Sequence, residues 1–428
     1  MRSALRAAPR LTRRQLLSGA PRQAPPADER ALIAHLLRRT SFGPRPGQVE
    51  ALAGAGVAAA LDAVLAAAPQ TVAPPEFGTD DDERVLVEWW LATMGSLHAG
   101  LHERMAWCWH GHLTSSLEKA PVQLMWRQHQ LLRTHALGNF RTLLGAIAVD
   151  AAMLAWLDGD GSVAEAPNEN FGREVMELFA LGRDSGYTQD DVRAASQAFS
   201  GWWIDDEDRN VVRFDAATGP QRAVTLLGRS VRSAADAVDA ICDHPSCAPF
   251  VAAMIHRALT GVVPGPERLA ELAATFRQGG LEIRPVVEAV LRHPSFFELR
   301  LNRARVPVEW YVAASAVLGS ELDLDVLDRL GQIPFAPPSV AGWPGGDRWL
   351  SAGAALTRAQ AAWDASDDTE VTDGADPVAA IVAKASLYEL SDATRAALVA
   401  AAGGVDERRE RASLLHALVV CCPEFVLA

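Results

Sequence analysis

Several familiar features are missing from this chain of 428 residues. No apolar run approaches the roughly 18 residues of a membrane-spanning helix, so the sequence predicts no transmembrane segment. The five cysteines form no Cys-x-x-Cys pair, and an odd number suits no disulfide framework. We therefore expect buried thiols in a reducing compartment, and a cytoplasmic location.

The signatures of several common activities are missing as well. The chain has no Gly-x-Ser-x-Gly motif, and none of its cysteines lies in a recognisable nucleophile motif. No glycine-rich phosphate loop follows a predicted strand, so nucleotide binding is not expected. The net charge is −13 although the first 27 residues hold six arginines and no acid. The remainder is therefore strongly acidic, which argues against nucleic acid as a partner.

The N-terminal segment differs in composition from the rest of the chain. Residues 1–27 are rich in arginine and proline, which predicts a disordered tail. Within it, Thr12-Arg-Arg-Gln-Leu-Leu17 resembles a twin-arginine export signal, but the residues that follow do not form an apolar h-region. Export by such a degenerate signal is the alternative to a cytoplasmic location.

From Asp28 onward the pattern is mostly helical. Alanine and leucine dominate, and apolar residues recur at helical spacing. This predicts a mainly α fold, a multi-helix single domain over residues 28–428. The period changes after Trp203, where Asn210–Phe214 and Ala223–Leu227 predict one short β-hairpin near residues 210–227. Residues 363–377 carry six acids and predict a solvated loop insert.

The most polar predicted helix runs from Pro167 to Gly182. Asn168 suits the N-cap, and Gly182 suits the position after the last turn. Glu169 and Arg173 have the favourable spacing for a helical ion pair. The remaining polar side chains lie opposite an apolar arc: Asn170, Glu174 and Glu177. This pattern fits a solvated helix with one surface salt bridge. It also fits a buried polar site in which carboxylates bind a metal or transfer protons.

A second group of polar residues lies in the helix predicted over residues 101–115. Glu103 and His110 share one stripe of this helix with Trp107. At about 100° per residue, His112 points roughly 160° away from His110. The two imidazoles share a face only if Gly111 breaks the helix. The alternative is that both are buried histidines with satisfied hydrogen bonds.

Together these stretches resemble one bacterial family, the domain of unknown function 1800. The matching segments are His35–Gly43, Glu103–His112, Pro167–Gly182, Tyr187–Val192, Ala198–Trp202, Pro307–Glu309 and Pro337–Trp343. The resemblance implies no established activity. It does imply relatives that carry export signals and are often encoded beside a sulfatase-like protein, and hence a shared task in the cell envelope.

The chain departs from the family pattern at two places. The family usually has an asparagine in the loop before Pro167, where this chain has Ser162. The family often has a His-Asp pair before a glycine and a lysine in the hairpin, whereas this chain has Phe214-Asp-Ala-Ala-Thr-Gly-Pro-Gln-Arg222. A site that required that histidine is altered here.

Two functions remain open from the sequence. The first is a metal-assisted hydrolase, because carboxylates and imidazoles suit several divalent metal ions. Its expected catalytic residues are Glu169, Arg173, Glu174 and Glu177, its binding residues Asn168, Asn170, Glu103 and Trp343, and its metal ligands His110, His112, Glu174 and Glu177. The second is a non-catalytic binding or assembly protein that works with a sulfatase-like partner or with glycans. The sequence does not decide between enzyme and binding protein.

Overall fold

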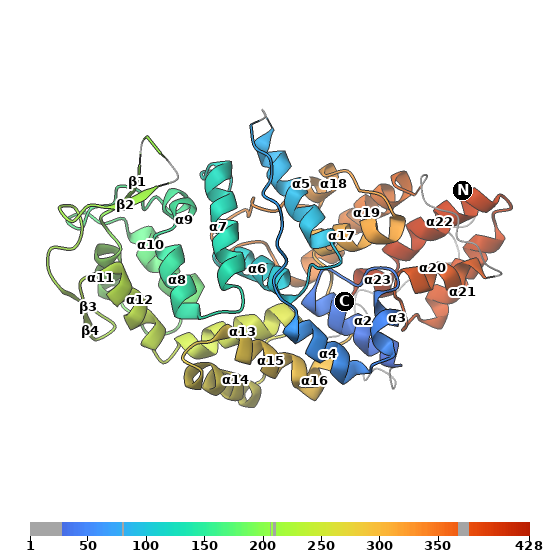
Figure 1. Ribbon diagram of the computed structural model, residues 1–428, viewed down its shortest axis with the longest axis horizontal. Helices are drawn as coiled ribbons and strands as arrows, with labels where there is room; N and C mark the ends of the chain where they lie inside the picture. Colours follow the sequence, from blue (N-terminus) through green and yellow to red (C-terminus); the bar gives the residue numbers. More distant parts are fainter. Residues whose placement is uncertain (1–27, 79–80, 206, 209–210, 367–375) are drawn as a thin grey trace.

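The computed structural model describes residues 28–78, 81–205, 207–208, 211–366 and 376–428 (Figure 1). In this part of the chain there are 22 α-helices, one π-helical turn, one 3-10 helix and two small two-stranded sheets. The predicted mainly α fold is confirmed. The tail predicted over residues 1–27 and most of the predicted acidic insert lie outside the described residues.

The regular elements between residues 28 and 156 are all α-helices. Side chains cap several of its helices: Asp28 accepts a hydrogen bond from the Arg30 amide, and Asn139 and Asp150 cap the helices that follow them. The helices are α2 (Glu29–Thr40), α3 (Gln48–Ala53), α4 (Val57–Ala66), α5 (Asp82–Gly95), α6 (Leu101–His112), α7 (Val122–His135), α8 (Phe140–Ala148) and α9 (Ala151–Trp156).

The middle of the chain holds the polar helix and the strands. The elements are α10 (Glu169–Glu174), the π-helix η2 (Val175–Ala180), α11 (Gln189–Ala198), β1 (Trp202–Ile204), β2 (Val212–Phe214), β3 (Val224–Leu226) and β4 (Arg229–Val231).

Two strands lie where the sequence predicted them, but the predicted pairing was wrong. β2 pairs with β1, and β3 pairs with β4, both antiparallel. The reason is local: Leu227 and Gly228 both have positive φ, the backbone twist of a tight two-residue hairpin turn, so β3 turns back at once onto β4.

Five of the remaining helices begin with proline. Proline has no amide hydrogen, but an amide in the first turn of a helix has no carbonyl partner within that helix, so no hydrogen bond is lost. The remaining helices are α12 (Ala234–Asp243), α13 (Cys247–Thr260), α14 (Pro266–Gln278), α15 (Ile283–Arg292), α16 (Pro294–Glu298), α17 (Pro307–Leu318), α18 (Asp325–Leu330), the 3-10 helix η3 (Gly346–Leu350), α19 (Ala352–Asp364), α20 (Pro377–Lys384), α21 (Asp392–Gly403), α22 (Arg408–Cys421) and α23 (Pro423–Val426).

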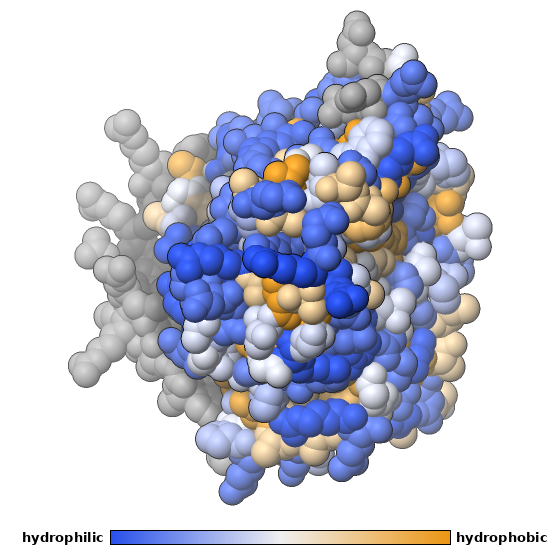
Figure 2. Space-filling model, turned by 90° about the vertical axis from the view of Figure 1, so that its left-hand side faces the viewer, coloured by the Kyte–Doolittle hydropathy of each residue, from blue (hydrophilic) through white to orange (hydrophobic). Residues whose placement is uncertain are grey.

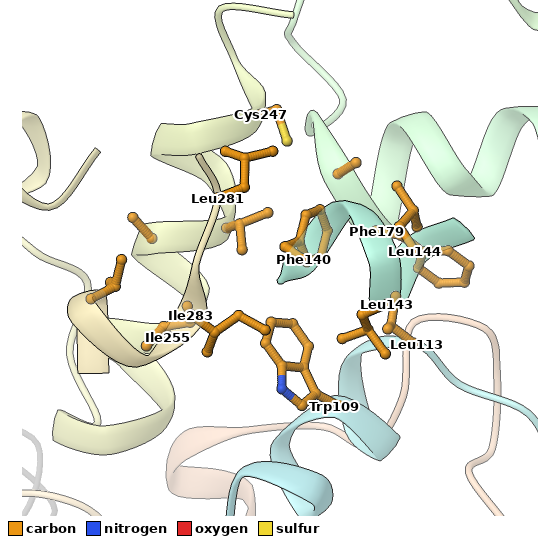
Figure 3. Close-up of a cluster of buried hydrophobic side chains, with 14 of the residues drawn as sticks. Trp109, Leu113, Phe140, Leu143, Leu144, Phe179, Cys247, Ile255, Leu281 and Ile283 are labelled. Carbon is orange, nitrogen blue, oxygen red and sulfur yellow. The ribbon is translucent and has the colours of Figure 1, made fainter. Parts of the chain in front are cut away.

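Two hydrophobic clusters fill the interior. The first joins α2, α6 and α8 to α13 and α15, and Figure 3 shows Trp109, Phe140 and Ile283 converging in it. The second joins α5 to α17 and the C-terminal helices through Trp90, Trp310 and neighbouring aliphatic residues. All five cysteines are free thiols. None of the described helices is both long and apolar enough to cross a bilayer.

Candidate functional site: the polar helix and the buried ionic network

Helix α10 starts at a well-anchored N-cap. The Asn168 side chain accepts a hydrogen bond from the Asn170 amide at 2.9 Å, as the sequence predicted. The Asn168 side chain also donates to the Asp158 carbonyl at 2.7 Å, and its backbone amide donates to the Ser162 hydroxyl at 3.1 Å. At the position of Ser162 the family resemblance led us to expect asparagine. Here the Ser162 hydroxyl oxygen fixes the start of the polar helix.

The predicted helix is not α-helical throughout. After Glu174 it continues as the π-helical turn η2, and the Leu181 and Gly182 amides both bond to the Met176 carbonyl, at 2.9 and 3.0 Å. A π-turn is rare and inserts a residue into the helical register, and such turns occur frequently at functional sites. Glu174 is the last residue of α10, and Glu177 lies in the π-helical turn. Gly182, with φ of +88°, ends the helix as predicted.

One glycine lets α10 pack directly on α11. A Cβ at Gly172 would lie 2.2 Å from the Ser196 hydroxyl oxygen and 2.8 Å from the Ser196 backbone nitrogen. No side chain larger than hydrogen fits between the two helices at this point. This close approach brings Gln189 and Arg193 of α11 to the polar face of α10.

Glu169 is the centre of a half-exposed ionic group. Arg173 lies 3.1 Å from its carboxylate, Gln189 donates to it at 2.6 Å, and Arg193 lies 3.6 Å away. The ion pair predicted between Glu169 and Arg173 is therefore present. Both side chains are more than a third exposed, so this group contributes at most about 1 kcal/mol to stability.

The other two carboxylates of the polar face differ in their partners. Glu177 accepts hydrogen bonds from Arg183 at 2.7 Å and from the Tyr187 hydroxyl at 3.2 Å. Glu174 is half-buried and bonds to no other described residue. Burial raises the pKa of Glu174, and the nearby Glu177 raises it further. Asn170, one turn before Glu174, is exposed.

The polar face lies on the open surface at one end of the molecule. Two cavities of the described chain are lined by residues around α13 to α15 and around α12, and neither includes a residue of α10 or η2. Figure 2 shows the same end of the molecule, where hydrophilic residues cover most of the surface and apolar residues form small patches among them.

Glu103 belongs to a different, buried network. Its carboxylate accepts hydrogen bonds from Trp90 at 2.6 Å and from Arg133 at 2.8 Å, and His129 lies 3.4 Å away. Burial acts to raise the pKa of Glu103, but His129 and Arg133 outweigh it and hold the pKa below its usual value. The carboxylate is therefore a satisfied structural anion rather than a free reactive group.

The two predicted metal-binding histidines face different parts of the core. His110 accepts a hydrogen bond from the Phe335 amide at 3.1 Å, whereas His112 lies 2.8 Å from the Phe179 carbonyl and donates to it. Burial lowers the pKa of His110 to about 3 and that of His112 to about 4, so both rings are neutral. The helix does not break at Gly111.

The predicted metal set is therefore not assembled. Among the residues that the structure describes, no group of three or more His, Cys, Asp and Glu side chains could hold a metal ion. The reason is the regular course of α6, which turns His110 toward Trp90 and Trp343 and turns His112 toward Phe250. The polar face and the histidines are separate features.

Trp343 is likewise part of the core packing. Its ring stacks on Trp107 at 5.3 Å and lies 5.4 Å from His110. Gly342, with φ of +78°, allows this approach, because a Cβ there would lie 2.5 Å from the Gly111 carbonyl oxygen. The stacked face of Trp343 is therefore not available to a sugar ring.

Sequence reasoning missed a second buried ionic network. Glu309 of α17 binds Arg104 of α6 through one oxygen and Arg303 through the other, at 2.7 Å in the second case. Arg104 and Glu309 are 3% and 4% exposed at the side chain. No local pattern in the sequence predicts this network, because Arg104 and Glu309 lie 205 positions apart in the chain.

The geometry defines the class: a helical protein with a buried Glu/His/Arg network and a separate polar helix at its surface. The family model described as protein of unknown function (DUF1800) matches residues 35–427. The chain therefore belongs to this family. No curated protein and no solved structure matches it.

Proposed function

We propose that this protein is a binding or assembly protein, and that the outward side of α10 and η2 is its recognition surface. The surface consists of Asn170, Arg173, Glu174 and Glu177, with Arg183 and Tyr187 at its edge. The observation that supports this most strongly is Glu174. Its carboxylate is half-buried beside a second carboxylate and has no hydrogen-bond or ion-pair partner among the described residues.

A carboxylate in this setting is destabilising unless a partner neutralises it. A basic side chain from another molecule would remove the repulsion between Glu174 and Glu177 and supply the hydrogen bonds that Glu174 lacks. Asn170 is exposed, and Arg173, Glu174 and Glu177 are partly exposed beside it, which suits a macromolecule better than a small substrate. The occupant that we favour is a protein that presents arginine or lysine, and the sulfatase-like neighbour implied by the family resemblance is the first to test.

The experiment is a calorimetric titration of the purified sulfatase-like protein into the full chain and into a Glu174→Gln variant. The variant keeps the side-chain shape and removes the charge, so we expect the Kd to rise at least tenfold, about 1.4 kcal/mol. Glu83→Gln is the matched control, because Glu83 is an exposed glutamate of α5, away from this surface. Equal affinity for all three proteins, or no binding by the unmodified chain, would reject the proposal.

A second function is favoured by one observation, the raised pKa of Glu174 next to Glu177. A carboxyl group whose pKa is raised beside a second carboxyl group can act as a general acid. A hydrolase of this type would show a pH profile that Glu174→Gln abolishes, while binding of the sulfatase-like protein stays unchanged. Rates measured across pH on glycan and sulfate-ester substrates separate this function from the first.

A further inference from the structure

Helix α19 and the turn before it expose large apolar side chains to solvent. Leu356 is 70% exposed, Trp363 is 47% exposed, and Leu350, just before the helix, is 37% exposed. These are three of the eight large hydrophobic side chains that the described chain exposes, and they lie in one short segment. Single exposed hydrophobic residues are ordinary, but a group of them on one element marks an interaction surface.

The exposed apolar residues of α19 form one stripe along the helix. The stripe consists of Ala352, Leu356, Ala359 and Trp363, all of which are exposed. Successive members are four, three and four residues apart, the spacing that places side chains along one side of an α-helix. Arg358 and Ala361, on the opposite side, are buried. The helix therefore has one apolar side packed on the protein and a second one without a partner in the described chain.

The order of small and large side chains in the stripe is self-complementary. In two antiparallel copies related by a two-fold axis, Trp363 of one copy meets Ala352 of the other, and Leu356 meets Ala359. Each layer then holds one large and one small side chain. The same spacing defines the a and d positions of a coiled coil, whose side chains pack as knobs into holes. A parallel pair would instead place Trp363 on Trp363 and alanine on alanine, which leaves the layers unequal in width.

Charged residues at the two ends of α19 agree with the antiparallel arrangement. Arg348 lies just before the helix, Asp364 is its last residue, and both are exposed. Neither has a hydrogen-bond or ion-pair partner among the residues that the structure describes. Antiparallel helices bring the start of one helix beside the end of the other. Arg348 of each copy would therefore lie near Asp364 of the other, which gives the pair complementary charges.

We propose that this protein forms a symmetric dimer in which the α19 stripes of two copies pack against each other in antiparallel orientation. A single pair of helices buries a small area, so the dimer is weak and dissociates on dilution. Figure 1 shows α19 in the right-hand half of the molecule and α10 in the left-hand half. The dimer thus leaves the polar face of α10 free in both copies, and its formation does not depend on the function proposed for that face.

The test is sedimentation equilibrium of the full chain over a wide range of protein concentration. We expect a monomer–dimer equilibrium. Trp363→Glu places a charge opposite Ala352 in an apolar layer, so the dissociation constant of the dimer should rise about tenfold or more. Val399→Glu is the matched control, because Val399 is a 55% exposed apolar residue of α21, and it should keep the dissociation constant. Both variants should fold, because each side chain is exposed in the monomer.

A change of size tests the pairing of the side chains. Ala359→Phe adds apolar surface but fills the space that Leu356 of the second copy occupies, so we expect weaker association. In the double variant Leu356→Ala/Ala359→Phe the large and small residues exchange places, and association should return. A surface that associates without a defined pairing would bind more strongly in Ala359→Phe, and this result would overturn the proposal.

A change of charge tests the orientation of the two helices. Arg348→Glu alone should weaken the dimer at low salt, because it places like charges together, and Arg348→Glu/Asp364→Arg should restore it. A monomer at every concentration, or equal dissociation constants for the unmodified chain and Trp363→Glu, would overturn the proposal. If the chain stays monomeric and Trp363→Glu instead abolishes binding of the sulfatase-like protein, the stripe belongs to that partner and the dimer is ruled out.

Discussion

The polar helix α10 and the network around Glu309 contain the same residue types in opposite surroundings. The Glu169 and Arg173 side chains are 37% and 38% exposed, whereas those of Glu309 and Arg104 are 4% and 3% exposed. Water competes for the Glu169–Arg173 pair, so the free energy of the pair differs little from that of the two side chains hydrated separately. No water competes for the second pair, and each charge depends on the other. Chemically similar ion pairs therefore contribute little to stability in one place and much in the other.

The largest effect that separates these regions is expected for Glu309→Gln. This change leaves Arg104 and Arg303 buried without their carboxylate, and breaking a buried ion pair on one side typically costs about 3–5 kcal/mol. The matched variant Glu169→Gln on α10 should cost no more than about 1 kcal/mol. Urea unfolding of both variants measures the two losses.

If Glu309→Gln and Glu169→Gln lost similar stability, the predicted difference between the buried network and the surface ion pair would be wrong. In that case water would reach Glu309 and the network would not be a dry interior. The double variant Glu309→Gln/Arg303→Met is the control, because it removes one of the newly unpaired charges. It should be more stable than Glu309→Gln alone.

A smaller effect is expected where α10 packs on α11. In Gly172→Ala the added methyl would lie 2.2 Å from the Ser196 hydroxyl oxygen and 3.0 Å from the Val192 carbonyl oxygen, so the helices must separate. Overpacking of this kind costs about 1–3 kcal/mol. Gly111→Ala on α6 is the control, since nothing lies within 4 Å of a Cβ there, and it should be neutral or slightly stabilising. Thermal unfolding of both variants decides whether the close approach is real.

A pH effect of intermediate size is expected from the interior. The pKa of buried His112 is lowered to about 4, whereas an unfolded imidazole binds its proton near pH 6.5. Between these values the unfolded chain holds more protons than the folded one, so stability is lost as the pH falls. One such histidine contributes a loss of about 2 kcal/mol between pH 7 and pH 5.

Urea unfolding at the two pH values measures this loss. His112→Gln can still donate to the Phe179 carbonyl and should show a smaller decrease. His98→Gln changes an exposed histidine and should leave the decrease unchanged, because that ring stays in water. An identical decrease in all three proteins would mean that water reaches His112 in the folded chain.

Local features were the ones that the sequence predicted well. The N-cap at Asn168, the ion pair between Glu169 and Arg173 and the end at Gly182 all depend on residues within one or two turns of each other. The mainly α fold follows from the same short-range periodicity. The π-helical turn after Glu174 was not predicted, because the sequence pattern was interpreted as one regular helix from Pro167 to Gly182.

Long-range contacts were the ones that the sequence did not predict. Arg104 and Glu309 are 205 positions apart, and the hydrogen bond between His110 and Phe335 joins residues 225 positions apart. The sequence analysis placed His110 and the polar helix in one site, because both lie in polar motifs that resemble those of the family. The structure separates them, since a regular α6 turns His110 toward Trp90 instead. Motif order along the chain carries no information on which side chains meet.

The smallest expected effect compares two surface ion pairs of opposite order. Glu169 precedes Arg173 in α10, whereas Arg84 precedes Glu88 in α5, and both pairs are spaced by four residues. The order with glutamate first agrees with the helix dipole and is the more favourable one. Double-mutant cycles should give a larger coupling energy for the α10 pair, and both coupling energies should be lost in high salt. A larger coupling for the α5 pair would mean that Gln189 and Arg193, rather than the helix, determine the charge environment of Glu169.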